Sequence, residues 1–209
     1  MNYTQLVAAA TAYADRNDIE VNNNIDNFFI MAEARINRAL KTAGQTHRVY
    51  TNTINGKEYY TLPPEYNGMR VVHFNTGQVD KSGSQPIQLY YTTPENIVNL
   101  QELGDVDKQY YTIVNNQLQL HQTLPGGGTI EMVFYRKVPP LSQTNQENWL
   151  SQDAPDIYLS GLCAEIELFV KNYDAATLWD SRMSRAVDEL SGNDVQNRWA
   201  GNSLVIRNA

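Results

Sequence analysis

The chain has 209 residues, 42% of them hydrophobic, which is enough for one core or a core with a sizeable excursion. Its single cysteine, Cys163, excludes an internal disulfide. The formal net charge of −7 argues against a protein that grips nucleic acid by neutralising phosphates, although an acidic wall would let DNA slide past. No apolar run approaches the roughly 20 residues that span a bilayer. The first residues lack the basic start and apolar stretch of a secretion signal, so we expect neither a membrane nor export.

Two amphipathic helices are predicted at the N-terminal end. The first covers residues 3–16, with Asn2 or Thr4 as its N-cap. The second covers residues 25–40, where apolar residues recur at steps of three and four, and Gly44 is its expected stop.

After these helices the apolar residues begin to alternate, as is typical of strands. Asn55–Gly56 lies between two short alternating runs and predicts a tight hairpin. Asn115–Asn116 predicts a second hairpin, and a short helix with Thr93 as its cap and Pro94 in its first turn is expected through Leu103. The other strand candidates are MRVVHFN, PIQLYY, QYYTIV, QLQLHQ and TIEMVFYRKV. Short turns between consecutive strands favour an antiparallel sheet or a small sandwich.

Residues 148–190 are predicted to form two consecutive helices with a joint at 172–174. Ser151 and Asp153 can cap the first helix, Pro155 fits its first turn, and Asp174 can cap the second. The first helix presents an apolar stripe of Tyr158, Leu162, Ile166 and Phe169. On the second helix one line contains Leu178, Arg182, Ala186 and Leu190, flanked by Trp179 and Met183. The short joint favours a helical hairpin packed face to face.

The predicted fold is therefore α+β. A bundle of N- and C-terminal helices (residues 1–45 and 146–199) carries an inserted β-rich domain (residues 46–145) and an extended C-terminal arm (residues 200–209). The arm contains the apolar segment Leu204–Ile206. Either it folds back onto its own domain or it adds to the sheet or groove of a partner.

Residues that could perform catalysis are present but not in catalytic patterns. His47, His73 and His121 lack any metal-binding spacing, and Cys163 is best explained as a buried core residue. Glu165 and Glu167 lie two apart on a helix and so point to different sides. We therefore expect no enzyme activity, no metal and no cofactor.

A small basic cluster follows the second helix. It consists of Arg35, Arg38 and Lys41, with Arg48 soon after. Cations are favoured at a helix C-terminus by the helix dipole, which explains most of this cluster. The alternative is contact with an anion or an acidic partner.

Tyrosines outnumber phenylalanines by thirteen to five, and several occur as adjacent pairs in the strand region. These pairs are Tyr59–Tyr60, Tyr90–Tyr91 and Tyr110–Tyr111. One residue of each pair faces outward if the strands are regular. The outward tyrosines are expected either in subunit interfaces or, as an alternative function, on a β-sandwich module that binds glycans.

Several phrases, in order along nearly the whole chain, resemble the phage head-to-tail adaptors, also called connector, gatekeeper or tail tubular protein A-like proteins. The longer ones are FFIMAEARINRAL, YYTIVNNQLQL and LWDSRMSRAVDEL. The last strand leads into a phrase supplied here by Tyr135, Pro139, Leu141 and Ser142, and then into Asn148–Leu150. A helix start at Pro155–Gly161 and a tryptophan with spaced arginines complete the resemblance.

This resemblance implies a virion structural protein that forms a dodecamer ring between the portal protein and the tail nozzle or tail tube. DNA would pass through the ring without sequence-specific binding. The protein would be found in the host cytoplasm before assembly and in the virion neck afterwards. Subunit packing is expected at Trp149, Tyr158, Trp179, Arg182 and Arg185, and a portal-contacting arm at Leu204, Val205, Ile206 and Arg207.

Overall fold

The computed structural model describes residues 1–76, 86–103 and 108–199. The chain divides into two compact units, a helical unit of Met1–Gly44 with the chain from Val138 onward and a sheet unit of Gln45–Lys137. Helices at both ends and a sheet between them confirm the predicted α+β class. The expected arm at 200–209 lies outside the described residues.

The helical unit contains six helices in the described part of the chain. They are α1 (Tyr3–Tyr13), α2 (Ile19–Asn23), α3 (Ile25–Ala39), α5 (Trp149–Asp153), α6 (Pro155–Phe169) and α7 (Tyr173–Trp199). The short helices α2 and α5 were not predicted. Asn2 caps α1 because its side chain accepts a hydrogen bond from the Gln5 amide at 2.8 Å, while the Gln5 side chain accepts from the Asn2 amide at 3.0 Å.

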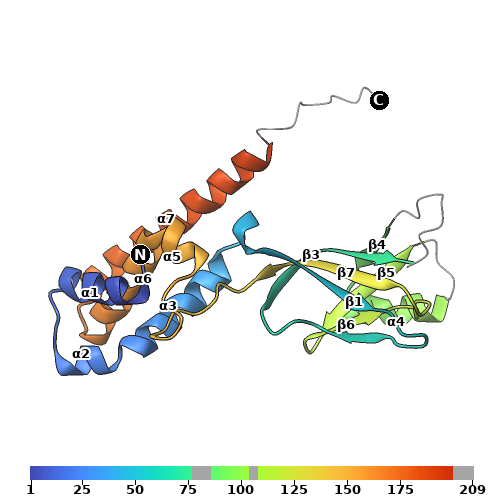
Figure 1. Cartoon of the computed structure of the whole chain (residues 1–209), viewed down its shortest axis with the longest axis horizontal. Coiled ribbons are helices and arrows are strands. Elements are labelled where there is room, and N and C mark those ends of the chain that lie inside the picture. The colour runs from blue at the N-terminus through green and yellow to red at the C-terminus, as the bar shows by residue number, and fades with distance from the viewer. Residues whose placement is uncertain (77–85, 104–107, 200–209) are drawn as a thin grey trace. The chain divides into compact units, whose positions relative to one another are not determined.

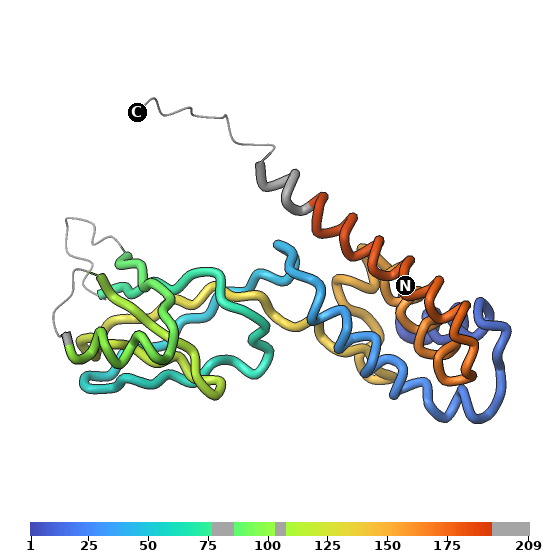
Figure 2. The backbone as a smooth tube through the Cα atoms, turned by 180° about the vertical axis from the view of Figure 1, so that it is seen from behind, coloured from blue at the N-terminus to red at the C-terminus, as the bar shows by residue number. Residues whose placement is uncertain are grey.

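Helix α6 is the centre of the helical unit, with α1, α3 and α7 packed around it (Figures 1 and 2). The predicted stripe on α6 is fully buried at Tyr158, Leu162 and Ile166, whereas Phe169 is partly exposed. Gly161 permits close packing, since a Cβ there would lie 3.2 Å from Ala32 and 3.3 Å from Met183.

The predicted hairpin of α6 and α7 is confirmed, but the predicted line on α7 is wrong by about one residue. In the part of α7 whose side chains the structure describes, the buried residues are Ala176, Met183 and Val187, whereas Leu178 is 63% exposed. Helix α7 packs mainly on α6, and it also contacts α1 through the Tyr13–Trp179 ring pair and α3 through the Arg35–Asp180 ion pair. The helix begins at Tyr173, so Asp174 lies in its first turn and is not its cap.

The sheet unit is a seven-stranded mixed sheet with α4 (Pro94–Leu103) packed on β5 (Figure 1). The strands are β1 (Thr46–Asn52), β2 (Tyr59–Thr61), β3 (Tyr66–Asn75), β4 (Ile87–Tyr91), β5 (Gln109–Val114), β6 (Gln117–Leu120) and β7 (Thr129–Arg136). Their order is β1-β7-β3-β4-β5-β6-β2. The predicted antiparallel sheet or small sandwich is confirmed as an inserted sheet, but one strand pair, β4 with β5, is parallel. A parallel pair requires a crossover, and α4 lies within that connection.

Of the two predicted hairpins, one forms and one does not. Asn115 and Asn116 join β5 to β6, and both have positive φ values, 46° and 59°. The hairpin at Asn55–Gly56 is wrong because β1 pairs with β7 and β2 pairs with β6, at opposite ends of the strand order. The predicted hairpin would pair β1 with β2, which has only three residues. Strand β1 instead pairs with β7 over seven residues.

Each unit has its own hydrophobic core. In the sheet unit Val72, Leu118, Ile130, Met132 and Phe134 are fully buried and belong to one cluster. The helical core forms a second cluster from α1, α3, α6, α7 and the segment that returns from β7.

Candidate interaction surface

The side chains that could perform catalysis lie apart from one another and make structural contacts. In the described ranges no cluster of three or more His, Cys, Asp or Glu side chains could hold a metal ion. The His121 Nδ1 atom accepts a hydrogen bond from the Tyr110 amide at 3.0 Å, and His73 lies 3.5 Å from Glu131. None of the helices described is both long enough and apolar enough for a membrane span.

The helical unit has a surface furrow along α3, bounded by α6 at one end, by α6 and α7 in the middle and by α7 at the other end. It consists of three adjoining hollows of about 400, 390 and 400 Å³. Leu168 lines both the first and the second hollow, and Arg35 lines both the second and the third, so they form one continuous surface. We call this surface the α3–α7 furrow.

One end of the furrow is apolar and exposed. Five large apolar side chains lie along it with exposed fractions from 43% to 63%, namely Ile30, Met31, Leu168, Phe169 and Tyr173. An edge-to-face contact with Phe28, at 5.4 Å between ring centroids, supports Phe169. Contiguous apolar surface of this kind marks interaction sites more often than isolated exposed residues do.

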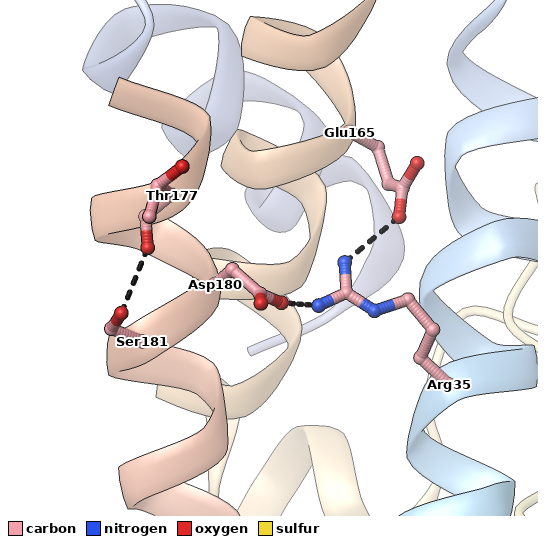
Figure 3. A network of polar contacts seen from close by, with 5 residues as sticks. All are labelled: Arg35, Glu165, Thr177, Asp180 and Ser181. Atoms are coloured by element: carbon pink, nitrogen blue, oxygen red, sulfur yellow. Dashed lines mark hydrogen bonds and ion pairs between the residues drawn. The ribbon is translucent and has the colours of Figure 1, made fainter. Parts of the chain in front are cut away.

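The middle of the furrow is held by Arg35, which bridges two acidic residues on different helices (Figure 3). Its Nη1 atom lies 3.0 Å from Glu165 Oε1 on α6, and its Nη2 atom forms an ion pair with Asp180 on α7. The Arg35 and Glu165 side chains are 29% and 11% exposed, so the first ion pair is largely shielded from water. One cation of the predicted basic cluster, Arg35, therefore links α3, α6 and α7.

The other arginines of the predicted cluster have different positions. Arg38 and Asp188 line the third hollow, at the charged end of the furrow. Arg48 lies in the sheet unit, where its Nε atom is 2.9 Å from Glu131 Oε1. Among Arg35, Arg38 and Arg48, only the position of Arg38 is still explained by the helix dipole.

The buried carboxyl group of Glu33, on α3, holds the segment that returns from β7. The Glu33 Oε1 atom accepts hydrogen bonds from the Leu141 amide at 2.7 Å and from the Tyr158 hydroxyl at 3.2 Å. Asn148 Nδ2 donates to the Tyr158 hydroxyl and to the Pro139 carbonyl, each at 2.7 Å. Burial, only partly offset by these hydrogen bonds, raises the pKa of Glu33 to about 7.

The same side of α3 holds the start of this segment. Asn37, one turn after Glu33, accepts a hydrogen bond from the Val138 amide at 2.7 Å. Two side chains of α3 thus satisfy backbone amides that leave the sheet and have no strand partner.

A family model described as SU10 adaptor protein matches residues 1–207. The chain belongs to the SU10 adaptor protein family. It is thus a structural phage adaptor protein, and the predicted family is confirmed. No curated protein matches the chain.

The residues that the resemblance assigned to subunit packing occupy several places in the adaptor. Tyr158 has no exposed surface, so we assign it to the core of its own chain. Trp149 is half-buried against the same core, and a Cβ at Gly44 would lie 3.2 Å from its ring. The predicted portal-contacting residues, Leu204, Val205, Ile206 and Arg207, lie outside the described residues.

The other three assigned residues, Trp179, Arg182 and Arg185, lie on α7. The Trp179 ring packs edge to face on Tyr13 at 5.9 Å, and the Arg182 guanidinium lies 4.6 Å from the centre of the Trp179 ring. Arg185 is exposed. We call Tyr13, Leu178, Trp179 and Arg182 the α1–α7 strip.

The tyrosine pairs of the adaptor's sheet follow the expected alternation only in part. Tyr60 and Tyr111 are buried, and their neighbours Tyr59 and Tyr110 are exposed or half-buried. Tyr90 and Tyr91 are both exposed, although they are adjacent in β4. Tyr90 contacts Tyr110 at 6.2 Å and Tyr91 contacts Tyr111 at 5.8 Å, so the parallel pairing of β4 and β5 aligns like residues.

Proposed function

We propose that this protein is the head-to-tail adaptor of a phage virion and forms a dodecamer ring between the portal and the tail nozzle or tail tube. The match of residues 1–207 to the adaptor family carries this proposal. The protein is made in the host cytoplasm and functions in the virion neck. Its role is structural and needs neither a catalytic group nor a cofactor.

The overall charge supports passage of DNA through such a ring. Acidic residues outnumber basic ones by 23 to 16, which gives the net charge of −7. Tight, sequence-independent binding of DNA depends on Lys and Arg contacts to phosphates, and its strength grows with their number. A predominantly acidic ring subunit keeps such contacts few, so that DNA moves through without being retained.

The surfaces of the helical unit support ring formation. A ring whose subunits are related by rotation uses two different surfaces on each subunit. The α3–α7 furrow and the α1–α7 strip are two different surfaces that could serve, because the furrow exposes Met31 and Leu168 and the strip exposes Leu178.

The C-terminal arm is the proposed portal contact. Leu204, Val205 and Ile206 are three consecutive apolar residues, and Arg207 adds a positive charge. Apolar residues of this kind are favoured when a partner's groove or sheet removes them from water.

The test is to mix the purified protein with the portal ring of the same phage and measure the assembly by native mass spectrometry and electron microscopy. We expect a complex with one adaptor copy per portal subunit, in which the adaptors form a second ring. A truncation that removes residues 204–209 should keep its circular dichroism spectrum but lose portal binding. An adaptor that stays monomeric beside its portal would refute the proposed function, and undiminished binding of the truncated form would refute the arm contact alone.

A further inference from the structure

The apolar end of the α3–α7 furrow exposes a sizeable hydrophobic surface. Taking roughly 200 Å² for a fully exposed side chain of this size, its five members present about 500–600 Å² to solvent. This area is at the upper end of the range for the largest apolar patch on a monomeric protein, and patches of that size are often functional. A standard protein–protein interface buries about 800 Å² on each partner, so this patch supplies most of one side of such an interface.

We infer that the α3–α7 furrow receives the α1–α7 strip of a second copy of this chain, and that this contact closes the ring. The inference rests on the proposed ring function and adds the two surfaces that meet.

The distribution of exposed apolar side chains in the helical unit favours this pairing. Outside the furrow, the large apolar side chains that are exposed in the described helical unit are Tyr13, Ile19 and Leu178. Two of these belong to the strip, where Trp179 and the stacked Arg182 extend the same surface. Aromatic residues and arginine are the types enriched at the centres of interfaces.

Charge favours the same pairing. The strip carries Arg182, with Arg185 exposed nearby on α7. The furrow carries Asp180, whose side chain is 51% exposed, and Asp188 at the charged end. Asp180 is already paired with Arg35 of its own chain. Asp188 is therefore the furrow carboxylate that Arg182 or Arg185 of the next copy would approach, beside Arg38, which has the same charge as they do.

A furrow-to-furrow arrangement would behave differently. It is an isologous contact, which joins two copies and then stops. The strip-to-furrow contact is heterologous and continues from each copy to the next. Cysteine cross-linking on the portal separates these two arrangements.

The experiment uses the full chain with Met31→Cys in the furrow and Leu178→Cys in the strip. Both positions are exposed, whereas the native Cys163 is fully buried. The double variant is assembled on portal, treated with a short bismaleimide and run on a denaturing gel. We expect a ladder from dimer upward, and monomer only from each single variant. A dimer from Met31→Cys alone, or no ladder from the double variant, would overturn the inference.

A second variant tests the contact without cross-linking. Met31→Glu places a charge in the apolar end of the furrow and should lower the occupancy of adaptor on portal by about tenfold or more. Ile54→Glu is the matched control, because Ile54 is similarly exposed but lies in the sheet unit. Full occupancy by Met31→Glu, with wild type also assembled, would overturn the furrow contact and leave the proposed function standing. Wild type that fails to assemble would overturn both.

Discussion

Glu33 and Leu141 are 108 positions apart in sequence, and the carboxyl group of one accepts the backbone hydrogen bond of the other at 2.7 Å. This bond attaches the segment that leaves the sheet to the middle of α3. It also places an ionisable group in the helical core, next to the Tyr158 hydroxyl and, beyond that, Asn148. The consequence is a dependence of stability on pH that can be measured.

Replacing Glu33 by glutamine should remove that pH dependence. In the folded protein the pKa of Glu33 is about 7, whereas an unfolded glutamate titrates near 4.3. The contribution of the protonated Glu33 carboxyl to the free energy of unfolding is therefore complete below about pH 4. It is lost as the pH rises through 7, a change on the order of 3 kcal/mol. The glutamine keeps an acceptor for the Leu141 amide and does not titrate.

Urea unfolding at about pH 5 and about pH 8 checks this prediction, with tryptophan fluorescence as the signal. All three tryptophans, Trp149, Trp179 and Trp199, lie in α5 and α7, so fluorescence reports on the helical unit. We expect the free energy of unfolding to fall with pH more steeply in wild type than in the variant. Equal slopes would contradict the assignment.

Replacing Arg35 by alanine should destabilise the helical unit by about 1–2 kcal/mol at neutral pH, because the Glu165 carboxylate is left largely buried without its partner. Arg38→Ala is the matched control, since Arg38 is an exposed arginine on the same helix, and it should change stability by less than about 0.5 kcal/mol. The double variant Arg35→Ala with Glu165→Gln should recover part of the loss. Additive effects in this cycle would show that the two residues do not interact.

Gly128→Ala should destabilise the sheet unit by about 1–3 kcal/mol, because a Cβ there would lie 2.5 Å from the Asn75 carbonyl oxygen and 2.6 Å from the Phe74 ring. Gly126→Ala, in the same turn, places its Cβ no closer than 3.2 Å and should cost less. Thermal unfolding followed by near-ultraviolet circular dichroism of the tyrosines measures both. A larger effect at Gly126 would contradict this packing at the start of β7.

Cys163 should resist thiol reagents in the folded protein. It is fully buried in α6, and burial raises the pKa of its thiol to about 12, so little of the reactive thiolate is present near pH 8. Labelling with a chromogenic disulfide reagent should be slow in buffer and immediate in concentrated urea. Rapid labelling in buffer would mean that α6 opens readily from its neighbours.

Local patterns predicted the elements that depend on nearby residues. The stripe Tyr158–Ile166 on α6 and the turn at Asn115–Asn116 formed as expected, because helical periodicity and positive φ values are properties of short stretches. The hairpin at Asn55–Gly56 carried an equally strong local signal and did not form. Its first strand found a longer partner in β7, and register over seven residues outweighs a favourable turn.

The sequence alone determined the family, the α+β class and the absence of any familiar catalytic pattern, because each of these depends on residue order and composition. The tertiary structure decided which face of α7 is buried, which carboxylates meet Arg35, and that Tyr158 belongs to the core. Those outcomes depend on how α1, α3, α6 and α7 meet, and residues more than a hundred positions apart become neighbours only when apolar surfaces are buried together.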